Sequence, residues 1–107
     1  MDIIELVPET FKSFIMQDKA VVDFYAPWCG PCRSMLRELE KKAVEFPDFP
    51  IGKVNIENAA NQELVKLFQV STIPAVFLFG KGKLLDHFTG YQPARLKEFC
   101  QTVNPKC

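Results

Sequence analysis

Two cysteines separated by two residues are the strongest chemical signal in this chain of 107 residues. They lie in the segment Trp28-Cys29-Gly30-Pro31-Cys32, which follows an apolar stretch and leads into a helical pattern. At the start of a helix, unpaired backbone N–H groups and the positive end of the helix dipole stabilise a thiolate. We therefore expect Cys29 to be a nucleophile. Cys32, one turn further in, is expected to be more buried and to reach the sulfur of Cys29.

The two residues between the cysteines bear on the redox character of the pair. Pro31 fits the first turn of a helix, where its missing N–H leaves no helical hydrogen bond unmade. A histidine here would stabilise the leaving thiolate and make the pair more oxidising. Gly30 and Pro31 carry no charge, so we expect the pair to act as a reductant.

The other two cysteines lie near the end of the sequence, at Cys100 and Cys107. Their spacing of seven fits poorly with the second close pair that a four-cysteine zinc site needs. A chain with 48% hydrophobic residues needs no disulfides to hold its core, so we expect no framework of two disulfides. Cys100 falls on the apolar stripe of the last predicted helix and is interpreted as an inert core thiol. Cys107 is expected to be mobile and to have no catalytic role.

A carboxylate interrupts the apolar run Val21-Val22-Asp23-Phe24-Tyr25 that precedes the cysteines. In a buried strand Asp23 would lose hydration, which favours its neutral form and raises its pKa. Such a group is suited to exchanging protons with a buried thiol near neutral pH. The alternative is an aspartate on an exposed face of the strand. Lys53, in the next predicted strand, either modulates the charge of Asp23 or is a solvated surface lysine.

Hydrophobic periodicity predicts the elements that must position these residues. Strands are expected over 3–6, 20–25, 51–56, 75–79 and 83–88, and helices from Pro8 and over 31–46, 61–68 and 93–103. The helix over 31–46 is predicted to bury one stripe, formed by Cys32, Leu36, Leu39, Ala43 and Phe46. The order βαβαβαββα predicts an α/β fold, with a mixed five-stranded sheet and helices on both faces.

Length and charge exclude several classes of protein. A chain of this length predicts a single domain spanning residues 1–107. Thirteen basic residues balance thirteen acidic ones, so we expect no nucleic-acid partner and no polybasic membrane patch. The longest apolar run, residues 75–79, is too short to span a bilayer. Residues 1–5 show no basic, apolar leader, which predicts a cytoplasmic protein without a signal peptide.

The segment from Val22 to Cys32 resembles the active-site segment of the thioredoxin family. Three further features match the family in order: Lys53, Ile73-Pro74 and Gly90. The resemblance covers the whole chain and implies a thioredoxin fold and the activity of a protein-disulfide reductase.

The resemblance also implies a substrate surface beside the cysteines. It implies a cis Ile73-Pro74 bond facing them, with the Ile73 backbone free to pair with an extended substrate strand. Gly90 would let a substrate backbone approach closely. The implied surface is a flat apolar rim formed by Trp28, Pro31, Ile73 and Gly90. For Trp28, packing in the core is the alternative.

By the same resemblance, Cys29 attacks a substrate disulfide and Cys32 resolves the mixed disulfide, with Asp23 as its acid/base, either directly or through a water. Electrons would come from NADPH through a flavoprotein, a thioredoxin reductase. The chain has no nucleotide-binding glycine motif, so it should not bind NADPH itself. We expect no bound cofactor. The implied partners are this reductase and disulfide-containing clients such as peroxiredoxins, and the protein is expected to be a monomer.

Two other functions compete with this interpretation. A disulfide isomerase or oxidase domain of the secretory pathway shares the sequence around Cys29, but Pro31 and the lack of a signal peptide or retention signal argue against it. A non-catalytic adaptor would use the same rim to hold a partner. An adaptor would need neither cysteine, so the presence of both Cys29 and Cys32 argues against this function.

Overall fold

The computed structural model describes residues 3–107. Met1 and Asp2, which belong to the segment interpreted as lacking a signal peptide, lie outside the described residues. The elements are β1 (Ile4–Glu5), α1 (Pro8–Ile15), β2 (Ala20–Tyr25), α2 (Gly30–Glu45), β3 (Ile51–Asn55), the short 3₁₀ helix η1 (Ala59–Asn61), α3 (Gln62–Leu67), β4 (Ala75–Gly80), β5 (Lys83–Thr89) and α4 (Pro93–Gln101). The predicted order of strands and helices is confirmed, with shifts of one or two residues at most ends.

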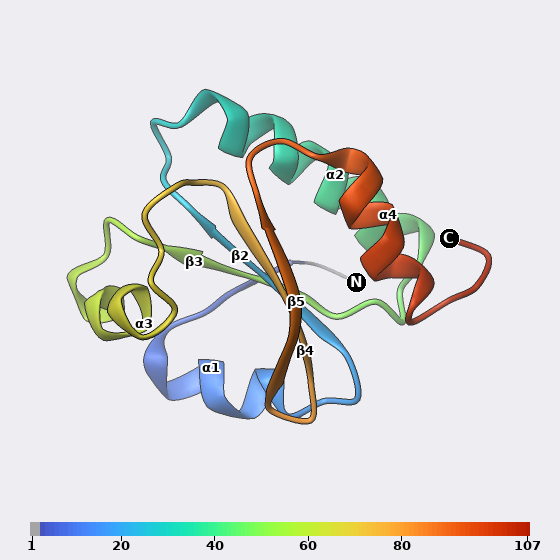
Figure 1. The fold of residues 1–107 in the computed structure, drawn as a ribbon, viewed down its shortest axis with the longest axis horizontal. Helices are drawn as coiled ribbons and strands as arrows, with labels where there is room; N and C mark the ends of the chain where they lie inside the picture. Colours follow the sequence, from blue (N-terminus) through green and yellow to red (C-terminus); the bar gives the residue numbers. More distant parts are fainter. Residues whose placement is uncertain (1–2) are drawn as a thin grey trace.

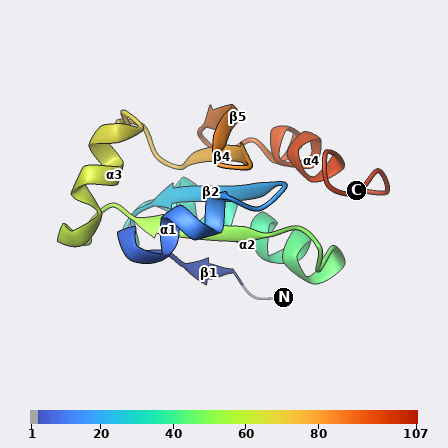
Figure 2. The ribbon, with the colours of Figure 1, turned by 90° about the horizontal axis from the view of Figure 1, so that it is seen from below.

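The five strands form one mixed sheet in the order β1-β3-β2-β4-β5. The first three strands of this order run parallel, and β4 is antiparallel to both β2 and β5. Helices α2 and α4 cover one face of the sheet, while α1 and α3 cover the other (Figures 1 and 2). The predicted α/β thioredoxin fold is therefore confirmed. None of the helices formed by residues 3–107 is long and apolar enough to cross a membrane.

Aromatic packing holds α1 and α3 against the sheet. Phe68, at the end of α3, lies with its ring centroid 5.5 to 6.0 Å from those of Phe11, Phe24, Phe77 and Phe79. Tilted and edge-to-face pairs at these distances stabilise a core beyond the area that they bury. Six of the ten phenylalanines lie in or against the cluster on this face, and the other four belong to the cluster on the opposite face.

The buried stripe of α2 differs from the predicted one at two positions: Phe46 lies just beyond the helix and is half-buried, and Met35 takes the place of Leu36. Met35 is fully buried and Leu36 only half-buried, whereas the sequence predicted Leu36 on the stripe. Both positions are compatible with helical spacing from Cys32, because 3.6 residues per turn allow a step of either three or four. The face that packs against the sheet decides between them, and it also carries Leu39.

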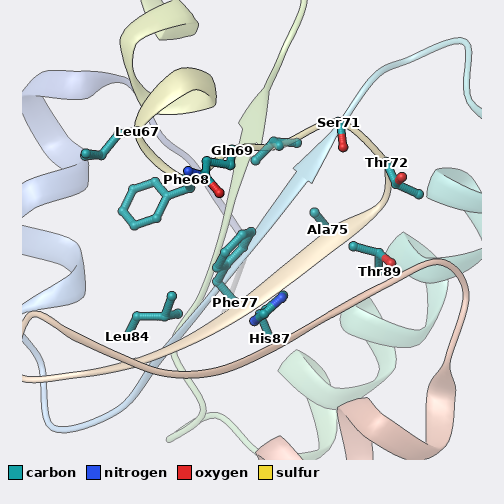
Figure 3. Close-up of a pocket in the computed structure, with 11 residues that line it drawn as sticks. Leu67, Phe68, Gln69, Ser71, Thr72, Ala75, Phe77, Leu84, His87 and Thr89 are labelled. Carbon is teal, nitrogen blue, oxygen red and sulfur yellow. The ribbon is translucent and has the colours of Figure 1, made fainter.

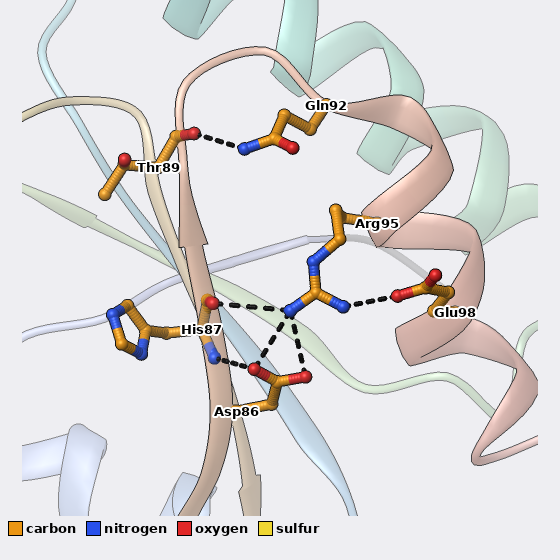
Figure 4. A network of polar contacts seen from close by, with 6 residues as sticks. All are labelled: Asp86, His87, Thr89, Gln92, Arg95 and Glu98. Carbon is orange, nitrogen blue, oxygen red and sulfur yellow. Dashed lines mark hydrogen bonds and ion pairs between the residues drawn. The ribbon is translucent and has the colours of Figure 1, made fainter.

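An arginine ties α4 to β5 (Figure 4). The Arg95 guanidinium donates to both carboxylate oxygens of Asp86 at 2.9 Å and also bonds Glu98. It lies over the rings of Phe88 and Phe99, 5.9 and 5.4 Å from their centroids. The hydrogen bond from Arg95 lowers the pKa of Asp86. This network fixes the last helix on the edge strand of the sheet.

The C-terminal cysteines correct three predictions. Cys100 and Cys107 form a disulfide, with their Cα atoms 5.8 Å apart. The chain reverses after α4 because the Asn104 N–H donates to the Cys100 carbonyl and the Cys107 N–H donates to the Asn104 carbonyl, each at 2.9 Å. The predictions of a free thiol at Cys100, a mobile Cys107 and no second disulfide are therefore wrong.

Candidate active site

The cysteine pair lies at the N-terminus of α2. Cys29 is the N-cap residue, in an extended conformation, and the Cys32 N–H donates to its sulfur at 3.2 Å. Pro31 occupies the first turn, as predicted. The two cysteines form a disulfide, with their Cα atoms 5.2 Å apart. Cys29 is 6% exposed and Cys32 2%, so the predicted difference in burial is present but small.

A second loop faces the disulfide from the start of β4. The Ile73-Pro74 peptide bond is cis, as the resemblance implies. The Ile73 carbonyl oxygen lies 4.0 Å from the Cys29 sulfur. The Gly90 N–H donates to the Pro74 carbonyl at 2.8 Å, which joins the end of β5 to the same loop. Segments that are far apart in the sequence thus meet around one sulfur atom.

The exposed residues beside the disulfide form an open surface. Trp28 is 64% exposed, so the alternative that it packs in the core is wrong. Gly30 and Pro31 are also exposed. Gly90 has a φ of +84°, and no atom lies within 4 Å of the position that its Cβ would occupy. A backbone from another molecule therefore has room to approach at this point.

Asp23 lies in the centre of the sheet and is fully buried. Within residues 3–107, neither of its carboxyl oxygens has a hydrogen-bond partner. Burial raises the pKa of Asp23 well above its ordinary value, while the nearby Lys53 ammonium acts in the opposite direction. The alternative of an exposed aspartate is therefore wrong. The register pairs Asp23 with Lys53, and Lys53 is only 24% exposed at its side chain, so it is not a fully solvated surface lysine.

Sequence reasoning missed the residues around Lys53. Its ammonium nitrogen lies 3.8 Å from the Glu5 carboxylate and 5.3 Å from the centroid of the Tyr25 ring. The Tyr25 hydroxyl donates to the same carboxylate oxygen at 2.7 Å. Burial and this hydrogen bond raise the pKa of Tyr25. The available signal was the predicted first strand, but no pattern in it shows which strand it pairs with.

A pocket of about 330 Å³ lies next to this site, between the end of α3, the loop before β4, and β5 (Figure 3). Its floor includes Phe77, on which the His87 ring stacks with centroids 5.4 Å apart. Thr72 and Thr89 line it and are the neighbours of Ile73 and Gly90 in the chain. None of the predicted site residues lines the pocket, so the redox chemistry takes place outside it.

The described residues include no group of three or more histidine, cysteine, aspartate or glutamate side chains arranged to hold a metal ion. The site holds the two sulfur atoms of Cys29 and Cys32, and the strand that precedes them holds a buried carboxyl group. Two electrons interconvert the Cys29–Cys32 disulfide and the dithiol.

Comparison with known proteins places this site in a family. The thioredoxin family model matches residues 2–102. A thioredoxin of Chlamydia pneumoniae is 41% identical over 91 residues, which cover 85% of this chain and 84% of the relative. The crystal structure of thioredoxin f2 from Chlamydomonas reinhardtii superposes with a TM-score of 0.86 at 31% identity, covering 97% of this chain and 98% of that one.

A further solved structure concerns the resolution of a yeast mitochondrial 1-Cys peroxiredoxin by the glutathione and thioredoxin systems. It superposes with a TM-score of 0.84 at 29% identity and covers 95% of this chain and 96% of that chain. The fold, the cysteine pair at the start of α2 and the matches agree. The chain belongs to the thioredoxin family, whose members carry no bound cofactor, and is a thiol–disulfide oxidoreductase that reduces disulfides with the pair Cys29–Cys32.

Proposed function

We propose that Cys29 is the attacking thiolate and Cys32 the resolving thiol. The observation that carries this assignment is the position of the Cys29 sulfur at the N-cap of α2, where it accepts a hydrogen bond from the Cys32 N–H. After reduction, the same N–H and the helix dipole would stabilise a thiolate on Cys29. Cys32, less exposed and one turn inside the helix, is placed for the second step.

The proposed reaction transfers two electrons from this pair to a client disulfide. The Cys29 thiolate attacks one client sulfur, which breaks the client disulfide, releases a client thiolate and forms a mixed disulfide. The Cys32 thiol then gives its proton to the Asp23 carboxylate, and the resulting thiolate attacks the Cys29 sulfur. This breaks the mixed disulfide, frees the second client thiolate and leaves the Cys29–Cys32 disulfide. A raised pKa makes Asp23 a stronger base for this transfer.

We propose that the client is held by the rim around the cysteines. Trp28 offers an exposed ring, and the Ile73 carbonyl oxygen lies 4.0 Å from the Cys29 sulfur. Pro74 and Gly90 are joined by a backbone hydrogen bond, which supports the two sides of the rim together. An extended client segment would pair with the backbone at Ile73.

We assign redox tuning to Gly30, Pro31 and Lys53. The first two place no charge beside the sulfur atoms and so do not stabilise the reduced form, which favours a reductant. Lys53 acts on the buried carboxyl group that accepts the Cys32 proton. The pair is therefore proposed to donate electrons to clients and not to accept them.

The proposed electron source is NADPH, delivered through a flavoprotein thioredoxin reductase. Peroxiredoxins are proposed clients, in keeping with the yeast structure that concerns a peroxiredoxin. We propose a cytoplasmic monomer of one domain, residues 1–107, without a nucleic-acid or membrane partner. The balanced charge supports the last part of this proposal. Gel filtration and cell fractionation test the oligomeric state and the location.

The residue roles are tested by reduction of insulin disulfides and by trapping. Cys29→Ser should abolish turnover, and retained turnover would refute the assignment of the nucleophile. Cys32→Ser should accumulate a mixed disulfide, seen as a client-sized mass increase that dithiothreitol reverses. Cys107→Ser is the matched control, because it removes a cysteine outside the pair and should leave turnover intact.

A further inference from the structure

A row of three ionisable side chains crosses the sheet on the face covered by α2. Glu5 of β1 lies in register with Lys53 of β3, and Lys53 lies in register with Asp23 of β2. Alternation along β2 places Asp23 on the same face as Val21, which packs in the cluster beneath α2. Lys53 therefore stands between two carboxyl groups, one at the sheet edge and one at its centre.

Lys53 makes its contacts at the end of this row that lies at the sheet edge, with Glu5 and Tyr25. Its ammonium nitrogen lies 3.8 Å from Glu5 Oε1 and over the ring of Tyr25. The Tyr25 hydroxyl donates to that same oxygen at 2.7 Å, which orients the carboxylate. At the inner end, neither oxygen of Asp23 has a hydrogen-bond partner within residues 3–107. The cation is thus held by the exposed carboxylate and not by the buried one.

Among the groups around Asp23, Lys53 is the charged group that lowers the pKa of its carboxyl group. The groups shown beside Asp23 are Lys53 of β3, Val76 of β4 and Tyr25 of its own strand, and Glu5 of β1 lies on the far side of Lys53. Of these, Val76 is apolar, and Tyr25 carries no charge at neutral pH because its pKa is raised. Where the lysine ammonium sits therefore decides how readily Asp23 releases its proton.

We propose that Glu5 is a positioning residue for the resolving step: together with Tyr25, it holds the Lys53 ammonium away from Asp23. The inference rests on the proposed role of Asp23 as the base for Cys32. A base must bind a proton firmly to take one from a thiol. A lysine paired directly with Asp23 would stabilise the carboxylate and weaken it as a base.

Glu5→Gln tests this inference with little change in shape. Glutamine keeps an oxygen that accepts from the Tyr25 hydroxyl but removes the charge that attracts Lys53. The titration of Asp23, followed by the ¹³C shift of its carboxyl carbon, should move about one pH unit lower, which is about a tenfold loss of proton affinity. The pH midpoint for resolution of a mixed disulfide should move by the same amount. Tyr25→Phe should give a smaller shift in the same direction.

The same substitution in a Lys53→Met protein separates an effect of Glu5 through Lys53 from a direct effect of the Glu5 charge on Asp23. In a Lys53→Met protein, Glu5→Gln should shift the Asp23 titration much less than it does in the wild type. Glu9→Gln, which removes an exposed charge from α1, should leave the titration and the rate profile unchanged. Unfolding melts establish that each variant is folded.

Three outcomes would overturn the inference, and they have different consequences. If the Asp23 titration does not move in Glu5→Gln, Glu5 does not position Lys53, and the proposed function stands. If the shift is equal in the Lys53→Met background, Glu5 acts directly. If the titration moves but the rate profile does not, Asp23 is not the base, and both this inference and that part of the proposed function fail.

Discussion

Asparagine in place of Asp23 should remove a pH dependence from the stability of this protein. Asp23 is fully buried without a hydrogen-bond partner among residues 3–107, and burial raises its pKa well above the ordinary value. Below the pKa of the unfolded chain the group is neutral in both states, and its contribution to stability is fully present. As the pH rises, the unfolded chain releases this proton while the folded protein keeps it, so stability falls until the folded pKa is reached.

The magnitude follows from the one proton involved. Between the unfolded and the folded pKa of Asp23, the folded state binds one more proton, so the free energy of unfolding falls by about 1.4 kcal/mol for each pH unit. Asparagine at this position does not titrate, so the variant should lack this slope. The difference in unfolding free energy between variant and wild type should therefore grow steadily in favour of the variant as pH rises.

The assay is urea unfolding of the disulfide-bonded protein at intervals from pH 4 to pH 8. The difference curve should rise by about 1.4 kcal/mol per unit from near pH 4 and level off at the folded pKa of Asp23. Asp48→Asn, at an exposed position, is the matched control and should give a flat difference curve. Parallel stability curves for Asp23→Asn and wild type would refute the burial of an unpartnered carboxyl group.

Three other perturbations test separate parts of the structure. Cys107→Ser opens the loop closed by the bond to Cys100 and should lower the unfolding free energy of the oxidised protein by about 2.5 kcal/mol, measured in urea; an unchanged value would mean that the bond does not constrain the chain. Arg95→Met should lower the free energy of unfolding by about 0.5–1 kcal/mol at neutral pH. This loss should disappear as the pH falls through the lowered pKa of Asp86, because a protonated Asp86 no longer attracts the arginine. A loss that persists at low pH would point to packing of the arginine and not to its charge. Trp28→Ala should reduce kcat/KM for insulin about tenfold while leaving the unfolding free energy unchanged, because the ring is exposed; a loss of stability would contradict its place on the rim.

Local patterns in the sequence were sufficient for the redox pair and for the burial of Asp23. The two cysteines lie three positions apart, so one helical turn brings them together, and the preceding strand and Pro31 determine where that turn begins. Asp23 stands between apolar neighbours in a strand that is buried on both faces, and such a strand has no exposed side for it. These features depend on residues close together in the chain.

Tertiary structure decided the features that depend on residues far apart. Glu5 meets Lys53 because β1 pairs with β3, and Ile73 faces Cys29 because β4 lies beside β2. Two elements with similar apolar patterns can pair in several ways, and only the packing of the whole sheet selects one.

The C-terminal disulfide was also decided by the structure, although its two cysteines are only seven positions apart. The apolar stripe of α4 predicted the burial of Cys100 correctly, but the partner of its sulfur depends on a turn that follows the helix. That turn is made by backbone hydrogen bonds through Asn104, and no residue pattern around it indicated that Cys107 returns to within reach. The sequence by itself therefore determined which side chains carry the redox chemistry. The electrostatic partners of these side chains were decided by strand pairing, because contacts between distant residues form only when the packed sheet brings them together. The covalent partner of Cys100 was decided by the reversal of the chain after α4.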